Sequence, residues 1–318
     1  MNKLYIISIL AVALFQVSCS RDFDPGVDVQ PIAVLNVLVE NDSSVSASVT
    51  RTWKFGGAAP DVIQRDADVH LLVNGDDMWQ MEFDADNGKY NSSYIARQGD
   101  HISISAHTRN YGDAEGATFV PKVVPIDSFS CIATRILDPD SYYVDVNGEI
   151  YRKDILHFQY KITFTDPGDE ENYYMISSSF EGESEPLFKE HNTPLDEVFL
   201  YSDEFNVFTD RSINGTTYTL NLSTKLWGLY GYDYTSQLVD TIKLYSISRD
   251  YYLYMLSIYR KYCGLNGELE SFGMAHPKNV YSNVAPGVGI VAASSFDKVV
   301  YNKYEDVKRL FPEWLPKE

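Results

Sequence analysis

Most of the chain alternates between apolar and polar residues with a period of two, which is typical of β-strands that bury one face. The clearest predicted strand covers residues 156–164, where five apolar side chains alternate with polar ones. Shorter segments with the same pattern cover residues 45–53, 69–73, 79–83, 102–106 and 218–222. The chain is therefore predicted to be mostly β.

Three Asn-Gly pairs stand between or beside these alternating segments and predict hairpins at Asn74-Gly75, Asn147-Gly148 and Asn214-Gly215. Both residues of such a pair accept the positive φ of a type I′ turn, whose twist matches that of two paired strands.

Two short helices interrupt the β pattern. Ser248 can cap the first helix, basic residues in its last turn suit the negative end of the helix dipole, and Gly264 can end it. A second helix is predicted over residues 301–310.

The spacing of strands and turns predicts two domains. Evenly spaced strands over residues 28–122 are typical of an immunoglobulin-like or transthyretin-like sandwich. Pro121 and Pro125 then predict a linker, because proline cannot donate a hydrogen bond in a central strand. Residues 123–318 are predicted to form a second β-rich domain that contains the one or two short helices.

The first 18 residues predict a lipoprotein signal peptide. The apolar run over residues 4–15 is too short to span a bilayer, but it fits the apolar region of a signal peptide. Ser18 directly before Cys19 resembles the site at which lipoprotein signal peptidase cuts, so Cys19 is the candidate lipidated residue. The alternative is an ordinary secretory peptide in which Cys19 has no special role.

Acylation at Cys19 would fix the protein to a membrane essentially permanently, because each buried methylene contributes about 0.8 kcal/mol. Residues 19–27 are polar and turn-rich and are predicted to form a lipidated tether. Asp22 and Asp24 within it weakly resemble a surface-export signal. The predicted location is the outer membrane, facing either the periplasm or the cell surface.

The charge of the chain argues against nucleic acid as a partner. The net charge is −19, from 45 acidic and 26 basic side chains, and a phosphate backbone would be repelled. No Lys/Arg cluster longer than a dipeptide offsets this charge.

No catalytic, cofactor-binding or metal-binding constellation is predicted. The six histidines form neither HExxH nor a Cys/His pair at zinc-ligand spacing. The acidic loop that begins at Asp166 is the strongest calcium candidate, although aspartates in turns also bond their own backbone. Cys131 and Cys263 can either form a disulfide or remain two buried thiols.

Tyrosine is the one residue type in excess, with 24 in the chain and nine from Tyr230 to Tyr262. Tyr230, Tyr232 and Tyr234 alternate with small or polar residues in a loop-like run and are the candidate ligand contacts. The alternative is that the tyrosines, above all those of the predicted helix, fill strand faces and the seat of the helix.

Three groups of motifs carry a resemblance to a known family. They are Phe164-Thr165-Asp166-Pro167 with Asn172-Tyr173-Tyr174, Ser246-Ile247-Ser248 with Tyr251-Tyr252-Leu253-Tyr254, and His276-Pro277 with Tyr281-Ser282-Asn283-Val284 and Gly287-Val288-Gly289. With the leader, they resemble the Bacteroidetes lipoprotein family called domain of unknown function 4249. The resemblance implies no catalytic residue, and it implies an accessory role beside a TonB-dependent outer-membrane receptor.

The motifs also have a structural interpretation. Asp166-Pro167-Gly168 can form a turn that closes the strong strand. Ser282-Asn283-Val284 and Gly287-Val288-Gly289 can form bends or bulges where a backbone passes close, and Pro286 with the residues after it predicts a turn into a strand.

The sequence thus favours a non-catalytic binding or accessory module on the outer membrane. One alternative is direct capture of a glycan or peptide through exposed tyrosines, and another is a metal-assisted hydrolase. The oligomeric state stays open.

Overall fold

The computed structural model describes residues 30–53, 60–144, 147–148, 150–180, 183–185, 187–190, 206–227, 238–262 and 279–312. The predicted signal peptide over residues 1–18, Cys19 and the tether over residues 19–27 lie outside the described residues. The fold is mostly β, as predicted.

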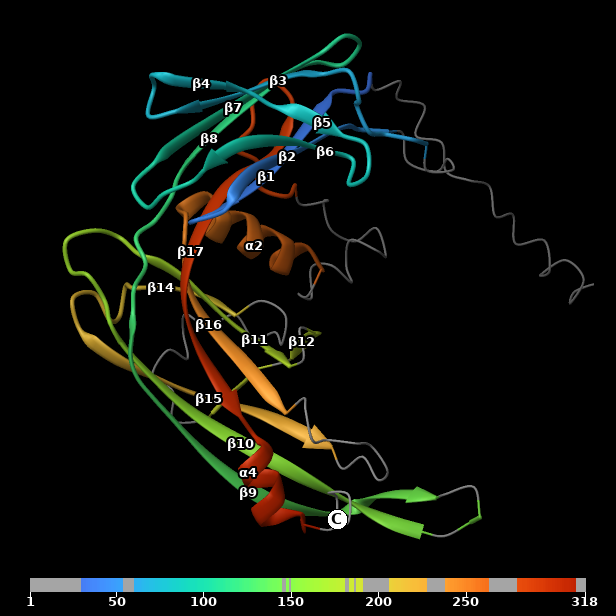
Figure 1. Ribbon diagram of the computed structural model, residues 1–318, viewed down its shortest axis with the longest axis vertical. Helices are drawn as coiled ribbons and strands as arrows, with labels where there is room; N and C mark the ends of the chain where they lie inside the picture. Colours follow the sequence, from blue (N-terminus) through green and yellow to red (C-terminus); the bar gives the residue numbers. More distant parts are fainter. Residues whose placement is uncertain are drawn as a thin grey trace, which may run out of the picture.

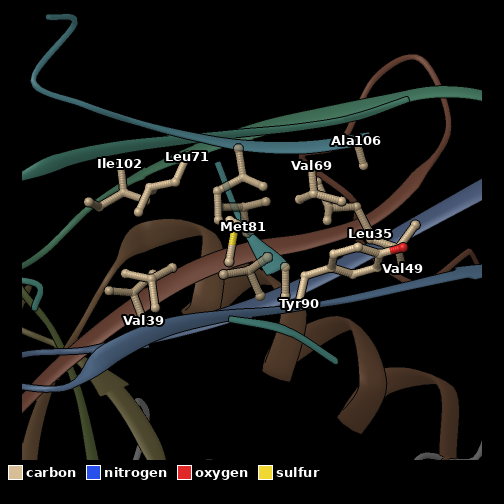
Figure 2. Close-up of a cluster of buried hydrophobic side chains, with 14 of the residues drawn as sticks. Leu35, Val39, Val49, Val69, Leu71, Met81, Tyr90, Ile102 and Ala106 are labelled. Carbon is tan, nitrogen blue, oxygen red and sulfur yellow. The ribbon is translucent and has the colours of Figure 1, made fainter. Parts of the chain in front are cut away.

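The first sandwich is built from two sheets that pack face to face (Figure 1). One sheet contains β1 (Ala33–Glu40), β2 (Ser44–Arg51), β6 (Lys89–Ile95) and β5 (Glu82–Asp84). The other has the order β4 (Asp77–Gln80), β3 (Asp68–Val73), β7 (His101–Thr108) and β8 (Gly112–Phe119). Alternate side chains of both sheets meet in one core, in which Figure 2 shows Leu35 and Val49 facing Val69 and Leu71. The predicted alternation is confirmed in β2, β3 and β7. It is wrong for residues 79–83, because Trp79 is 37% exposed in β4 whereas Phe83 lies in β5 of the other sheet. Trp53 also differs from the prediction, since β2 ends at Arg51 and Trp53 is 51% exposed.

The second sandwich follows the linker at residues 120–125. One of its sheets has the order β13 (Phe188–Lys189), β15 (Thr217–Trp227), β10 (Ile150–Thr165) and β9 (Ile126–Val144). The facing strands are β12 (Glu183–Glu185), β11 (Tyr173–Phe180), β14 (Val207–Thr209), β16 (Val239–Ile247) and the end of β17 (Val288–Asn302). Phe158, Phe164 and Tyr174 are fully buried between the two layers.

Strand β17 connects the two sandwiches (Figure 1). Residues 288–294 pair in parallel with β1, and residues 294–302 pair antiparallel with β16. One nine-stranded sheet therefore continues through both sandwiches. Val291 and Ala293 belong to the first core although they lie near the end of the chain, a contribution that the sequence did not predict.

Both predicted helices are present. Helix α2 (Arg249–Tyr262) begins directly after Ser248, whose Oγ accepts a hydrogen bond from the Tyr251 N–H at 3.3 Å. Helix α4 (Tyr304–Leu310) begins three residues later than predicted, because β17 extends to Asn302. Of the helices in the described part of the chain, none is long and apolar enough to cross a membrane.

Two of the three predicted hairpins are confirmed. Asn74 and Gly75, with φ of 53° and 84°, connect the paired strands β3 and β4, and Gly148 turns the chain between β9 and β10. The hairpin at Asn214-Gly215 is wrong. Gly215 does have a positive φ of 69°, but β14 before it pairs with β11 and β15 after it pairs with β10. The turn crosses from one layer of the sandwich to the other.

Candidate binding site

The edge of β17 that faces away from β1 is completed by side chains. Ser282 Oγ accepts a hydrogen bond from Gly289 N at 3.1 Å, and Asn283 Oδ1 accepts one from Val291 N at 2.9 Å. Two residues further, Ala293 N donates to Ser248 Oγ at 3.1 Å. From Ser294 onward the strand β16 supplies the partners. Backbone N–H groups at a strand edge need acceptors, and these three polar side chains supply them where no strand lies alongside.

The two glycines at the start of β17 allow its close approach to β1. Gly289 has a φ of 136°, and a Cβ at this position would lie 1.9 Å from the carbonyl oxygen of Leu35. Gly287 has a φ of 95° and faces the carbonyl oxygens of Ala33 and Asp113. The Gly-x-Gly motif is thus a turn into a strand, as predicted, and glycine is required for both space and conformation.

Asp166 links the end of β10 to the turn at Gly215 by hydrogen bonds. Its Oδ1 accepts a hydrogen bond from the Tyr174 hydroxyl at 2.5 Å, and its Oδ2 accepts one from Gly215 N at 2.9 Å. Burial raises the pKa of the Asp166 carboxyl. Both oxygens therefore bond protein groups, which fits the turn interpretation of this loop rather than the calcium interpretation.

Asn172 extends this hydrogen-bonded region. Its backbone N–H donates to Asp210 Oδ2 at 2.8 Å, and its side-chain amide donates to the carbonyl oxygens of Pro167 and Glu170. Among the described residues, no group of three or more His, Cys, Asp or Glu side chains is placed to hold a metal ion.

A groove lies between α2 and the outer face of β1, β2 and β17, with a volume of about 330 Å³. Helix α2 contributes Tyr251, Tyr254 and Met255. The sheet contributes the apolar side chains of Leu38, Ile290 and Ala292, with Asn36, Ser46, Ser48 and Lys89 adding polar groups. The groove joins the Tyr251–Tyr254 motif of α2 to the residues that directly follow the Gly287-Val288-Gly289 motif.

The sequence contained a signal for this groove. Leu38 interrupts the alternation of apolar and polar residues in β1, because an apolar side chain stands where a polar one is expected. It lies between the buried residues Val37 and Val39 and is 53% exposed on the opposite face. Ile290 likewise precedes buried Val291 on the opposite face of β17. Apolar residues on both faces of a strand indicate that something covers the outer face as well.

The tyrosines of α2 have two environments. Tyr252 packs on Tyr173 of β11, with ring centroids 5.1 Å apart, and this contact seats the helix on the second sandwich. Burial and a hydrogen bond to Glu171 raise the pKa of Tyr173 to about 12. Tyr251 and Tyr254 line the groove instead, and burial raises the pKa of Tyr251. Tyr252 thus fills the seat of the helix, as the alternative interpretation expects, and Tyr251 and Tyr254 line a groove as well.

A polar cleft of about 290 Å³ lies at the other side of the α2 start. Its lining includes Lys122 and Arg249 together with Glu170, Glu171 and Asp250. The Tyr281 hydroxyl donates to Asp250 Oδ1 at 2.5 Å, which ties the segment before β17 to the first turn of the helix. Burial raises the pKa of Tyr281 to about 12.

An ion pair is buried in the core of the second sandwich. Lys303 Nζ lies 2.7 Å from Asp240 Oδ2, and the two side chains are 1% and 0% exposed. The Tyr160 hydroxyl donates to the same oxygen of Asp240 and lies 2.9 Å from Thr224 Oγ1. Burial raises the pKa of Tyr160, so this hydroxyl remains a donor. Sequence patterns did not predict this pair.

The predicted ligand contacts Tyr230, Tyr232 and Tyr234 lie outside the described residues, as does Cys263. Cys131 is described and is a free thiol beside Tyr301. Burial raises the pKa of this thiol to about 11.

The search of curated proteins finds no match to this chain. A family model described as domain of unknown function (DUF4249) matches residues 20–299, which include all three motif groups. The chain belongs to the DUF4249 family.

Proposed function

We propose that the chain is an outer-membrane lipoprotein, anchored through Cys19, whose β body is a non-catalytic binding module that works beside a TonB-dependent transporter. The groove between α2 and the nine-stranded sheet carries this proposal, because it offers an apolar, tyrosine-rimmed surface. The polar side chains of the family motifs support it too. Their hydrogen bonds go to other groups of the protein and stabilise the fold, as in Asp166, Asn172, Ser248 and Asn283.

The partner is tested by affinity purification of the tagged, lipidated chain in a mild detergent. The expected result is co-purification of a TonB-dependent barrel, identified by mass spectrometry. Leu38→Glu, which places a charge in the groove, should abolish this recovery because the charge must lose water on binding.

Val300→Glu is the matched control, because Val300 is also on the nine-stranded sheet and is 58% exposed but does not line the groove. This variant should retain the barrel. Recovery of the lipoprotein alone, under conditions that keep other receptor complexes intact, would count against the transporter partner.

The anchor is tested separately by Cys19→Ala. The expected variant is an unacylated, soluble precursor that lacks the lipid mass and no longer fractionates with membranes. A variant that remains in the membrane fraction would contradict anchoring through Cys19.

A second candidate function is capture of a glycan or peptide by the same surface. Tyr251 and Tyr254 favour it, because they stand opposite the polar side chains of Asn36, Ser46 and Ser48 across the groove. On a ligand array, Tyr254→Ala should weaken binding, and so should Tyr232→Ala and Tyr234→Ala if the predicted loop contributes. Unchanged binding in all three variants would remove tyrosine-mediated capture.

A further inference from the structure

One end of the first sandwich exposes large apolar side chains at the point where the chain enters the fold. Ile32 and Thr52 are joined by two hydrogen bonds, from Thr52 N to the Ile32 carbonyl and from Ile32 N to Thr52 Oγ1, both at 3.0 Å. Ile32 is 40% exposed, and Trp53, the residue after Thr52, is 51% exposed. Ile32 lies two residues after Gln30, the first described residue, and the hydrogen bonds to Thr52 bring Trp53 next to it in the fold.

Two acidic side chains near this end are paired with arginines. Arg65 lies 2.7 Å from Asp61, and Arg109 lies 4.0 Å from Asp66. These arginines offset part of the acidic charge of the chain, whose net charge is −19.

Arg51 adds a cation above an aromatic ring at the same place. Its guanidinium carbon lies 5.4 Å from the centre of the Tyr111 ring, and the Tyr111 carbonyl accepts a hydrogen bond from Ala33 N. Tyrosine, tryptophan and arginine at one edge are the residues that suit a boundary between lipid and water, because their apolar parts enter lipid while their polar ends stay hydrated.

We propose that this end, formed by Ile32, Arg51, Trp53 and Tyr111, rests on the membrane, with Trp53 and Ile32 in the headgroup region of the bilayer. The inference rests on the proposed lipid anchor at Cys19. Ten residues separate Cys19 from Gln30. Even when fully extended they span at most about 35 Å, so the anchor keeps this end of the sandwich close to the lipid surface.

The orientation has a consequence for the groove. Strand β1 starts at this end, and Leu38 lies near its other end, toward the linker and the second sandwich. In Figure 1, β1 runs toward the second sandwich, so a body that rests on the start of β1 presents the second sandwich away from its own lipid anchor. The groove at Leu38 lies toward the same end of β1, where a partner can reach it.

The test uses the lipidated full-length chain in vesicles of phosphatidylethanolamine and phosphatidylglycerol whose acyl chains are brominated close to the headgroups. Bromine quenches tryptophan fluorescence only at short range. The expected result is quenching in the wild type, most of which is lost in Trp53→Phe and retained in Trp79→Phe. Trp79 is the matched control because it is 37% exposed but packs on Tyr94, at the side of the same sandwich.

Ile32→Glu provides a second variant in which Trp53 is still present. It should reduce the quenching of Trp53 without loss of vesicle flotation, because the acyl anchor is intact. Equal quenching in the wild type and Trp53→Phe, with the acyl mass and flotation both present, would overturn this inference and leave the lipid anchor standing. A Trp53 signal that lipid does not quench but a co-reconstituted barrel protein changes would also overturn it, in favour of a protein contact. A chain that lacks acyl mass and does not float would overturn the proposed function and this inference together.

Discussion

The side-chain amide of Asn283 bonds both backbone groups of Val291, as a neighbouring strand would. Its Oδ1 accepts from Val291 N at 2.9 Å, and its Nδ2 donates to Val291 O at 2.8 Å. The same Nδ2 also donates to the carbonyl oxygen of Ala117 at 3.1 Å, in the facing sheet. One side chain thus closes a strand edge and connects the two layers of the first sandwich.

Replacing Asn283 should therefore destabilise the whole fold. Asn283→Ala leaves the backbone groups of Val291 without partners, and we expect the free energy of unfolding to fall by about 2–4 kcal/mol. Asn283→Asp should be at least as harmful, because a carboxylate oxygen replaces the donor that faces two carbonyl oxygens. Urea denaturation measures both changes. Asn36→Ala, on the exposed face of β1, is the control and should change stability little. A small effect of Asn283→Asp would contradict the donor role of Nδ2.

Gly289 should tolerate no side chain. In Gly289→Ala the new Cβ would lie 1.9 Å from Leu35 O in a backbone with a φ of 136°, so β17 must move away from β1. We expect a loss of more than about 3 kcal/mol of unfolding free energy, or failure to fold. Thermal denaturation of the purified variant measures this loss.

Gly75→Ala separates conformational strain from steric overlap. Gly75 also has a positive φ, of 84°, but no atom lies within 4 Å of a Cβ built there. This variant should lose only about 1 kcal/mol, which is the conformational cost alone. Similar losses at Gly75 and Gly289 would show that the close approach to Leu35 is unimportant.

Alternation made most of the strands predictable, whereas strand β17 was predictable only at its start. In residues 156–164 every second side chain is buried, because one face of β10 meets the core and the other does not. In β17 both faces are covered between residues 290 and 295, so the sequence there does not alternate. Its partner residues are also distant in sequence, since Val34 pairs with Val288, and local patterns do not specify such pairing.

The turn at Asn214-Gly215 shows a related limit. Asn-Gly specifies a local backbone conformation, and Gly215 has the positive φ that this dipeptide favours. The dipeptide does not determine which strands pair on either side. Here Gly215 lies against Gly168, whose Cβ would be 3.0 Å from the Gly215 Cα, and the two loops pack together across the layers.

The motif residues were recognisable from the sequence, but their partners were not. Ser282 and Asn283 were expected at bends where backbone passes close, and the structure places them beside β17. The ion pair of Asp240 and Lys303 was not expected, because Lys and Asp are almost never fully buried unless paired and the pair lies far apart in sequence.

Acid should weaken the first sandwich through Asp100. Burial opposes ionisation of this carboxyl, but hydrogen bonds from the Tyr94 hydroxyl, the Asn74 amide and Arg97 N outweigh it, and the pKa is lowered. Because the folded pKa lies below the unfolded value, the contribution is fully present above the unfolded pKa of about 3.9. It is lost as the pH falls through the folded pKa.

Asp100→Asn should therefore lower the unfolding free energy by about 1–3 kcal/mol at neutral pH. The reason is that an uncharged amide replaces the carboxylate to which three groups donate hydrogen bonds. It should also reduce the loss of stability between about pH 5 and the folded pKa of Asp100, because the titrating group is gone. Urea unfolding at a series of pH values measures both effects. Asp76→Asn, in the exposed β3–β4 turn, is the control and should leave the loss of stability at acid pH unchanged. An equal loss of stability at acid pH in Asp100→Asn and the wild type would exclude Asp100 as its source.

The buried pair of Lys303 and Asp240 should show strong coupling. Lys303→Met leaves the Asp240 carboxylate in the core with the Tyr160 hydroxyl as its donor, and we expect a loss of about 3–5 kcal/mol. Asp240→Asn should be similarly harmful, because the ammonium group then lacks its carboxylate. The double variant should be more stable than the sum of the single losses predicts, because it removes both charges together. Urea denaturation of the four proteins gives the coupling energy as a double-mutant cycle. Additive losses would mean that the two charges do not stabilise each other. Lys303 would then be held in place by its position before α4 and by its contact with the Phe158 ring, whose centre lies 4.6 Å from the ammonium nitrogen.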